Sequence, residues 1–597
     1  MIKKKPYILC IFLIASLLLS SCGEVPAEPK GLSSTAEITA AEPMTIINPD
    51  MFSKRDLDAT FSEKNSAAIK LSGDSAECDY EGVKINGGNI TISSGGTYIV
   101  SGRLDDGSII VDAQDTDKIQ LVLSGAEISS KNYAAIYVKQ ADKVFVTLAD
   151  GTANYLSNGG TFSQKDDNNV DAAVFSKDDL TFNGSGKLTV DSPAGHAVVC
   201  NDELTVAGGS YVIHSGAQGL KAKDGILICA SQFEMKTGKD GIHAESGKEE
   251  AGLVYIDSGI FSIEADGDGI SASGTLTASS GSFDISCLDD SSSAKGLKAT
   301  GNIDISGGAF SIASADDGIH SNSDITISGG SMNISSGDDG VHADNSVSIS
   351  GGNICISKSY EGIEGKTVEI DGGEIRITAS DDGLNAAGGV DGSGFGGPEG
   401  PDKFSDGTDC HVHITGGSVY LNTDGDGIDS NGSLEVSGGV LFISGPTDRD
   451  NSAIDFESKG VITGGTVAAA GAAQMAVNFS EQSTQCSVLV DTGMQKGGSV
   501  IELKDSSGNE IINYIPEKDY ECVLISSPEL AVGQSYVLKA GDHEEAILID
   551  AVISGMTSGM GGMMPGHVMP GEMPPGKPGD IPPGGFDGKP PERPERK

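Results

Sequence analysis

Acidic residues recur beside a Gly-Ile or similar turn along this 597-residue chain. The turns read KDGIHAE (239–245), GDGISAS (267–273), DDGIHSN (316–322), DDGVHAD (338–344), DDGLNAA (381–387) and GDGIDSN (425–431). Carboxylate oxygens are the ligands that Ca²⁺ prefers in proteins, and several must converge on one ion. The acids at these turns are therefore candidate calcium ligands: Asp316, Asp317, Asp338, Asp339, Asp381, Asp382, Asp424, Asp426 and Asp429.

These turns belong to a sequence repeat. From about residue 217 to 386 the turn returns every 21 to 28 residues, most often every 22. Short runs between the turns alternate apolar and polar residues, as in ITIS (325–328) and MNIS (332–335), which predicts strands with one buried face. Glycine pairs such as Gly329-Gly330 separate the runs where left-handed backbone angles are needed. A period of this length is typical of a solenoid.

We therefore predict an all-β chain, a right-handed parallel β-helix with about 22 residues per coil, followed by a small antiparallel β unit. A β-sandwich of many short strands is the alternative, but sandwiches do not repeat their turn residues at fixed spacing. In a β-helix the inward residues stack from coil to coil. Two such ladders are expected, Ile319, Val341, Ile363 and Leu384 in one, and Ile312, Ile334, Ile356 and Ile377 in the other.

Stacked coils bring the turn acids close together. Neighbouring coils lie about 4.8 Å apart, so two carboxylates at that distance repel by roughly 3–4 kcal/mol at an effective dielectric constant of about 20. We expect these side chains to point outward, where a cation between two coils can contact carboxylates from both. A solvated acidic edge without metal is the alternative. Lys295 and Tyr360 interrupt the acidic pattern.

The N-terminus has the pattern of a targeting sequence. Residues 1–21 have the pattern of a signal peptide, with Lys3-Lys4-Lys5 before an apolar run from Ile8 to Leu19. The sequence around Cys22 matches a lipobox, which predicts acylation of Cys22 and a lipidated flexible tether over residues 22–50. We therefore expect a bacterial lipoprotein on the extracellular face of the cell membrane; a non-lipidated signal peptide is the alternative.

The rest of the chain divides by composition. The β-helix with its N-terminal cap is expected over residues 51–483, and a glycine-rich insert at 388–409 rises beside the densest acids. Hairpin-like strands over 484–553 predict the antiparallel unit. Residues 554–597 are rich in Pro, Gly and Met and are expected to be a disordered tail.

The charge of the chain restricts its partners. The formal net charge is −47 at pH 7, which excludes nucleic acid and anionic membrane surfaces as direct partners. An acidic polysaccharide is also repelled unless divalent cations link the two anions. The chain has no Trp, which weakens a model of flat aromatic platforms on neutral sugars. We expect a monomer.

Several phrases together resemble one known family. The opening coil SGGTYIVSGRLDDGSIIVDA (94–113), the DDGI-type turns and DGDGIDSNGSLEVSGG (424–439) are similar to the clostridial family of secreted carbohydrate-binding right-handed parallel β-helices, over roughly residues 80 to 553. The resemblance implies calcium-binding coils, affinity for polygalacturonate-type polymers and for cellulose, and no established catalysis. Its metal sites carry over only to Asp317, Asp339, Asp382, Asp424, Asp426 and Asp429.

These observations predict a surface-anchored lipoprotein that binds an acidic plant-type or cell-wall polysaccharide with calcium, and whose membrane contact is the lipid anchor alone. The candidate sugar-contacting residues are Lys298, His320, His342 and Arg376, and no catalytic residue is assigned. Two alternatives stay open. One is a calcium-dependent polysaccharide lyase in which Lys221 or Lys298 removes the C5 proton of a uronate. The other is a structural cell-surface protein.

Overall fold

The computed structural model describes residues 48–555 with gaps at 249–250, 290–292 and 388–408. The predicted signal peptide (1–21), Cys22 with the tether up to residue 47, the glycine-rich insert except for Asp409, and the tail beyond residue 555 lie outside the described residues. The 3₁₀ turn η1 (Glu63–Asn65) is the one helix in the described ranges. No helix in the described ranges is long and apolar enough to span a bilayer.

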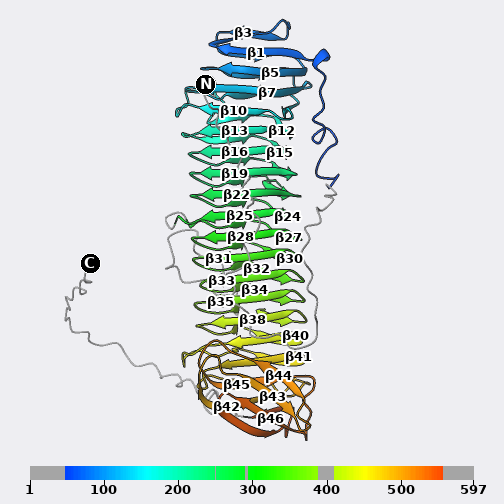
Figure 1. Ribbon diagram of the computed structural model, residues 1–597, viewed down its shortest axis with the longest axis vertical. Helices are drawn as coiled ribbons and strands as arrows, with labels where there is room; N and C mark the ends of the chain where they lie inside the picture. The colour runs from blue at the N-terminus through cyan, green and yellow to red at the C-terminus, as the bar shows by residue number, and fades with distance from the viewer. Residues whose placement is uncertain (1–47, 249–250, 290–292, 388–408, 556–597) are drawn as a thin grey trace, which may run out of the picture. The chain divides into compact units, whose positions relative to one another are not determined.

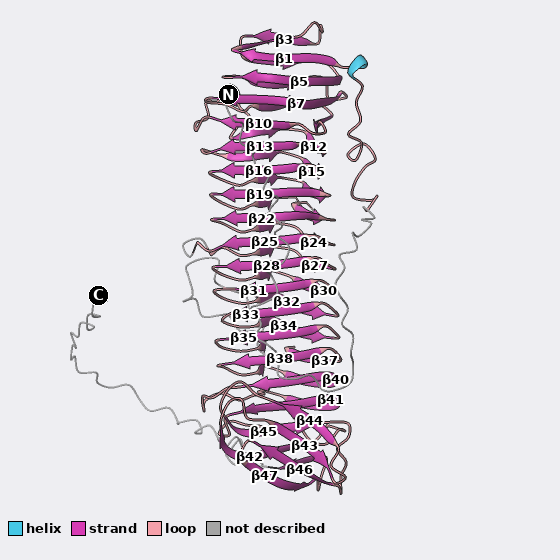
Figure 2. Ribbon diagram, in the orientation of Figure 1, coloured by secondary structure: helices cyan, strands magenta, loops and turns pink. Residues whose placement is uncertain are grey.

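Parallel strands build a solenoid of about 15 turns with three faces (Figures 1 and 2). The first face consists of β10 (Ala153–Asn158), β13 (Lys187–Ser192), β16 (Ser210–Ser215), β19 (Ser231–Thr237), β22 (Gly259–Ala265), β25 (Ser282–Cys287), β28 (Ala309–Ser314), β31 (Ser331–Ser335), β33 (Asn353–Lys358), β35 (Glu374–Ala379) and β38 (Ser418–Thr423). The second consists of β6 (Ser108–Asp112), β8 (Ile136–Gln140), β11 (Ala172–Ser176), β14 (His196–Cys200), β17 (Leu220–Ala222), β20 (Ile242–Ala244), β23 (Ile270–Ala272), β26 (Leu297–Ala299), β29 (Ile319–Ser321), β36 (Leu384–Ala386) and β39 (Ile428–Ser430).

The third face consists of β9 (Lys143–Leu148), β12 (Asp179–Gly184), β15 (Glu203–Ala207), β18 (Gly225–Cys229), β21 (Leu253–Ile256), β24 (Leu276–Ala278), β27 (Ile303–Ile305), β30 (Asp324–Ile327) and β37 (His411–Ile414). Longer strands bend from one face to the next: β5 (Gly96–Leu104), β7 (Lys118–Ser130), β32 (Val341–Ile349), β34 (Ile363–Ile370), β40 (Ser433–Ser444) and β41 (Lys459–Gly471). The first strands are β1 (Ala67–Gly73), β2 (Ser75–Glu77), β3 (Val83–Asn86) and β4 (Asn89–Ile92). The predicted parallel β-helix is confirmed.

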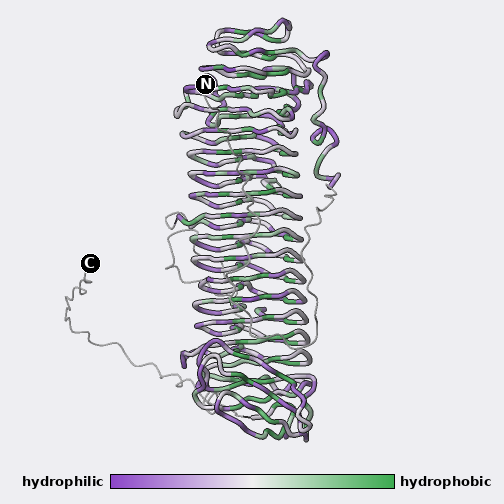
Figure 3. The backbone as a smooth tube through the Cα atoms, viewed as in Figure 1, coloured by the Kyte–Doolittle hydropathy of each residue, from purple (hydrophilic) through white to green (hydrophobic). Residues whose placement is uncertain are grey.

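The core is a column of inward side chains. Ile319, Val341, Ile363 and Leu384 pair in register from coil to coil, and so do Ile312, Ile334, Ile356 and Ile377, which confirms both predicted ladders. Along each coil, hydrophobic and hydrophilic residues alternate (Figure 3). This alternation lets every strand bury one face in the column and present the other outward.

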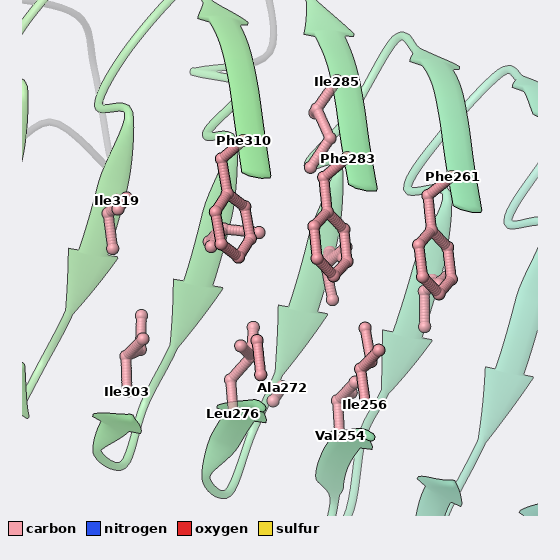
Figure 4. Packing of buried hydrophobic residues seen from close by; sticks show 14 of the residues in the cluster. Val254, Ile256, Phe261, Ala272, Leu276, Phe283, Ile285, Ile303, Phe310 and Ile319 are labelled. Carbon is pink, nitrogen blue, oxygen red and sulfur yellow. The ribbon is translucent and has the colours of Figure 1, made fainter. Parts of the chain in front are cut away.

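Aromatic rings form one further ladder inside the first face. Tyr211, Phe233, Phe261, Phe283 and Phe310 stack with centroid distances of 4.9, 5.4, 4.8 and 4.4 Å. Figure 4 shows Phe261, Phe283 and Phe310 side by side above the aliphatic residues of the other faces. The rings lie nearly parallel because successive coils place them in the same rotameric environment at the strand spacing. The coils therefore lock in register through large apolar contacts.

The turn glycines are required by close packing. A Cβ on Gly318 would lie 2.4 Å from Cγ2 of Ile334 and 2.6 Å from the carbonyl oxygen of Gly340. By contrast, the second glycine of each pair, such as Gly330 with φ +96°, is required by its left-handed backbone. The turn glycines are thus required by close packing, and the second glycine of each pair is required by its positive φ angle.

Mostly antiparallel strands close the C-terminal end of the solenoid. They are β42 (Ser487–Gln495), β43 (Ile501–Asp505), β44 (Glu510–Tyr514), β45 (Tyr520–Ser526), β46 (Ser535–Ala540), β47 (His543–Leu548) and β48 (Ile553–Gly555). β48 alone among them pairs parallel, with β42. β45 pairs antiparallel with β41, and a four-stranded sheet β44-β43-β46-β47 packs nearby in its own core with Leu503 and Leu538. The predicted antiparallel unit is confirmed, and it covers the edge that the last coil would otherwise expose.

Residues 48–66 form a strap along the third face rather than a coil (Figure 1, dark blue). The backbone N–H of Asn48 donates to Oδ1 of Asp257 at 3.3 Å, and Thr181 donates to Oδ1 of the buried Asp56 at 2.7 Å. Farther along, Nε2 of Gln120 donates to the carbonyl oxygen of Thr60. The strap thus runs across coils in the direction opposite to the growth of the solenoid.

The aromatic ladder gives a test of the packing. Phe261→Ala should lower the free energy of unfolding by about 3–5 kcal/mol, because it leaves a cavity between two stacked rings. Ile260→Ala is the matched control, since Ile260 is the neighbouring residue and is 54% exposed, and it should change stability by less than about 0.5 kcal/mol. Urea unfolding followed by circular dichroism measures both. Equal losses in the two variants would contradict this account.

Candidate functional site

The acidic turns stack because the backbone of each turn bonds to the next. The N–H of Gly296 donates to the carbonyl oxygen of Asp317 at 3.0 Å, and the N–H of Gly318 donates to that of Asp339 at 2.9 Å. The same bond recurs down the second face. The residue before each turn glycine therefore meets its counterpart in the next coil, and these residues form one column, here called the turn column: Asp240, Asp268, Lys295, Asp317, Asp339, Glu361, Asp382, Asp426 and Ser452.

The sequence led us to expect that the aspartates of the turn column point into solvent. In the structure they do not point freely into solvent. Asp317 is 1% exposed and Asp339 is 6% exposed. Oδ1 of Asp317 accepts the backbone N–H of Asp339 at 3.1 Å, and Oδ1 of Asp382 accepts the N–H of Asp426 at 2.6 Å. Each carboxylate thus bends over the next coil to satisfy an amide, which buries its charge and makes its neutralisation necessary.

In the part of the turn column nearer the N-terminus, a lysine neutralises the buried carboxylates. Nζ of Lys295, a residue 2% exposed, lies 2.6 Å from Oδ2 of Asp316 and 2.8 Å from Oδ2 of Asp317. Burial raises the pKa of Asp317, but Lys295, assisted by His320, outweighs burial and holds that pKa well below its usual range. The residue that interrupted the acidic pattern in the sequence is therefore an internal counter-ion.

Histidine rings contact the carboxylates one and two coils later. Nδ1 of His320 lies 2.8 Å from Oδ2 of Asp317. Nδ1 of His342 lies 3.0 Å from Oδ2 of Asp339 and 2.8 Å from Oε2 of Glu364. Burial lowers the pKa of His342, but Asp339, Asp344 and Glu364 outweigh burial and raise it well above the ordinary value, which favours the protonated ring.

The two histidines cannot serve as the predicted sugar contacts. Their rings stack at 5.1 Å, and the residues are 3% and 2% exposed. The prediction for His320 and His342 is therefore wrong, because each ring turns back onto the aspartate three residues before it instead of projecting from the strand.

The lower part of the column has no such counter-ion. Glu364, Asn385 and Asp429 follow one another in register, three residues after their turn-column partners. Ile428 bridges to Ile454, which places Asp455 next in line. Oxygens of Asp426, Asp429 and Asp455 lie within 4.8 Å of one another. Within the described ranges, no Lys, Arg or His forms an ion pair with any of these three acids or with Asp382.

The pKa values respond to this imbalance. Burial, followed by the neighbouring carboxylates of Asp426 and Asp381, raises the pKa of Asp382 to about 8. Burial, together with Asp429 and Asp455, raises the pKa of Asp426 to about 7. Burial and Asp455 raise that of Asp429 to about 6. These carboxylates are held where their charge is unfavourable, which is the condition that a bound cation relieves.

The same place gathers two carboxylates and a spare oxygen. A Cβ on Gly425 would lie 2.4 Å from Oδ1 of both Asp381 and Asp382, so only a glycine lets these two carboxylates lie this close to the next coil. Nδ2 of Asn385 donates to Oε2 of Glu361 at 2.6 Å, while its buried Oδ1 has no hydrogen-bond partner. We call this group the lower acidic cluster: Asp381, Asp382, Asn385, Asp426, Asp429 and Asp455.

The nine candidate metal ligands therefore lie in different surroundings and do not form one site. Asp316, Asp317 and Asp338 have oxygens within 4.8 Å of one another, but Lys295 already occupies the first two. Asp339 groups with His342 and Glu364. Asp424 pairs with Nζ of Lys518 at 2.7 Å. The remaining four, Asp381, Asp382, Asp426 and Asp429, lie in the lower acidic cluster.

Sequence reasoning missed Asp455 and the part that Asn385 plays. Asp455 lies in SAID (452–455), a degenerate turn in which Ser452 and Ala453 replace the Asp-Gly pair. The spacing to an isoleucine followed by an acid, as in GID (427–429), could have identified it.

The predicted basic contacts lie apart from this cluster. Nζ of Lys298 lies 3.3 Å from Oδ2 of Asp268 and borders a hollow of about 310 Å³ with Asp240 and Lys239. Arg376 lies on β35 of the first face, where its guanidinium covers the Tyr420 ring at 4.2 Å. The structure thus places Lys298, His320 and His342 in register on successive coils of the second face, whereas Arg376 lies apart on the first face.

Family comparison places these features in context. The model of a family described as "Carbohydrate-binding domain-containing protein" matches residues 86–340 and 339–502, more than half of the chain. The chain belongs to this family. A carbohydrate-binding domain-containing protein of Acetivibrio thermocellus is 32% identical over 151 residues, which is 25% of this chain and 53% of that protein. The chain thus spans about half the length of this relative.

A solved structure is also similar. It is described as the polysaccharide lyase-like protein from C. thermocellum, in a gadolinium derivative, with 26% identity and a TM-score of 0.35. The match covers 48% of this chain and 96% of that one. The name of the carbohydrate-binding family fits a binding protein, and the polar outer positions of its coils fit a polar ligand.

The raised pKa values predict how stability depends on pH. In the folded chain the pKa values of Asp429, Asp426 and Asp382 are raised to about 6, 7 and 8, whereas unfolded Asp loses its proton near pH 4. In EDTA the thermal midpoint should therefore fall by several degrees as pH rises from about 5 to 8. Calcium should restore it at the upper end, since an ion replaces the protons.

Paired variants serve as controls. Asp382→Asn with Asp426→Asn keeps the oxygens that accept backbone N–H groups and should flatten the pH dependence. Asp284→Asn with Asp304→Asn removes the same charge from exposed positions on other faces and should leave it intact. Differential scanning calorimetry measures all of these. A thermal midpoint at pH 8 that is the same with and without calcium would contradict a calcium site in the lower acidic cluster.

Proposed function

We propose that the chain is a surface-anchored lipoprotein that binds an acidic polysaccharide through calcium held in the lower acidic cluster. The observation that carries this proposal is the contrast within one column. Nζ of Lys295 contacts Asp317 and Nδ1 of His342 contacts Asp339, whereas no Lys, Arg or His of the described residues pairs with Asp382 or Asp426. A partly buried set of acids without such a partner is stabilised at neutral pH when an external cation joins it.

Calcium suits the available ligands. The cluster offers carboxylate oxygens and one amide oxygen, all hard donors, and no Cys or His. Ca²⁺ takes about six to eight oxygens in flexible geometry, which suits carboxylates from successive coils. Residues from one protein surface seldom fill every position, so oxygens of a ligand can complete the coordination.

The acidic ligand follows from charge. Family membership gives a carbohydrate as the kind of partner. With a net charge of −47 the protein repels a polyuronate, and a shared cation converts this repulsion into attraction. A polygalacturonate-like polymer has a carboxylate on each sugar, which can occupy open calcium positions. Cellulose lacks this group, so its binding should depend less on calcium. The lipid anchor at Cys22 rests on the lipobox alone.

Binding to polygalacturonate should therefore require calcium. Retention on immobilised polygalacturonate should rise with calcium to saturation and fall at least tenfold in EDTA, since two like-charged polymers then meet without a bridge. Asp382→Asn with Asp426→Asn should weaken retention similarly, and Asp284→Asn with Asp304→Asn should not. Retention that is equal in EDTA and in calcium for the unaltered chain would refute the bridging proposal.

A lyase activity is the second candidate, favoured by the hollow beside Lys298. There an amine lies among Asp240, Asp266 and Asp268, so a base and candidate cation ligands share one space. Nζ of Lys298 is already engaged by Oδ2 of Asp268 at 3.3 Å, and this contact competes with proton abstraction from a sugar. We therefore expect no 4,5-unsaturated uronate when the protein is incubated with polygalacturonate and calcium. Ultraviolet absorbance that grows with time and is lost in Lys298→Ala would establish the lyase instead.

A further inference from the structure

Tyr360 is an aromatic residue in an otherwise polar row of turn residues. Its backbone N–H donates to the carbonyl oxygen of Asp338 at 2.8 Å, and the N–H of Asp381 donates to the carbonyl oxygen of Tyr360 at 2.9 Å. The row therefore reads Asp338, Tyr360, Asp381 and Gly425 on successive coils. Tyr360 is 48% exposed, whereas the stacked rings of Phe233, Phe261, Phe283 and Phe310 are buried in the core.

The backbone places Tyr360 beside the lower acidic cluster. Because the N–H of Asp381 donates to the carbonyl oxygen of Tyr360, these two residues occupy the same turn position on neighbouring coils. The carboxylate of Asp381 is near enough to the Tyr360 hydroxyl to raise its pKa. Oδ1 of the same carboxylate lies, with Oδ1 of Asp382, against Gly425 on the following coil. Asp381 thus lies between the phenol and the rest of the cluster, while much of Tyr360 remains open to solvent.

An exposed ring so placed is suited to one kind of ligand. Tyr presents a rigid apolar face with a polar end, and it orders few torsions when it binds. Pyranose rings present C–H groups on one face and hydroxyl or carboxylate groups at their edge. A sugar that stacks on the Tyr360 face can therefore direct its edge toward the carboxylate of Asp381, which lies one coil away, about 4.8 Å along the solenoid.

We propose that Tyr360 and the lower acidic cluster form one sugar subsite, in which the ring stacks on a uronate pyranose and the cluster's calcium binds the carboxylate of that sugar. This subsite rests on the proposed function, because it needs calcium in the cluster. It assigns two parts of recognition to two groups. Tyr360 selects for a pyranose face, and calcium selects for an anionic edge.

The test uses the mature full-length chain and oligogalacturonate as the probe, with titration calorimetry in saturating calcium. Tyr360→Ala should weaken binding about tenfold, the value expected when a stacked ring is lost. Tyr360→Phe keeps the ring and should stay within about threefold of the unaltered chain. Tyr80→Ala is the matched control, since Tyr80 is 46% exposed and packs edge-on against Tyr98 at the N-terminal coils, and it should change nothing.

A second measurement separates stacking from metal binding. The rise in thermal midpoint on adding calcium should be the same in Tyr360→Ala as in the unaltered chain. If binding depends on calcium but Tyr360→Ala binds as tightly as the unaltered chain, the subsite is overturned while the bridging function stands. If the unaltered chain binds the oligomer equally with and without calcium, or does not bind it, the bridging function fails and the subsite with it.

Discussion

The stacking of one coil directly on the next is the constraint on which the rest of this molecule depends. Turn glycines permit it, since a Cβ on Gly318 would collide with Ile334 and with the next turn. Every position in a coil then meets the same position about 4.8 Å away. An apolar residue repeated in this way builds a core, and the aromatic ladder is its clearest case. A charged residue repeated in this way creates repulsion that must be compensated.

The turn column shows two forms of compensation. Toward the N-terminal side, Lys295 and His342 lie among the carboxylates as internal cations. Toward the C-terminal side the same backbone geometry continues, but among the described residues Asp382 and Asp426 contact other acids and backbone amides and no basic side chain. The same repeated turn therefore occurs both with basic partners inside the protein and without them, and in the second case a bound cation is our proposed substitute.

The sequence predicted the fold well because period and alternation determine which residues face the core, as in the ladder of Ile319 and Val341. It failed where direction is set by a turn rather than by a strand. The carboxylate of Asp317 and the ring of His320 bend back onto the chain, so both are buried instead of exposed. The strap was also missed. Residues 48–66 contain no repeat, and the partner of Asp56 at Thr181 is 125 residues away.

The strap has a consequence for the order of folding. Asn48 bonds to Asp257, a separation of 209 residues, so the strap cannot dock until the coil that contains Asp257 exists. Contacts of such long range form late because their loop-closure entropy is large. A chain that folds as it is synthesised from its N-terminus would thus extend its solenoid coil by coil before its first segment docks. Phe52 can therefore dock against Tyr255 only after roughly half of the solenoid has been completed.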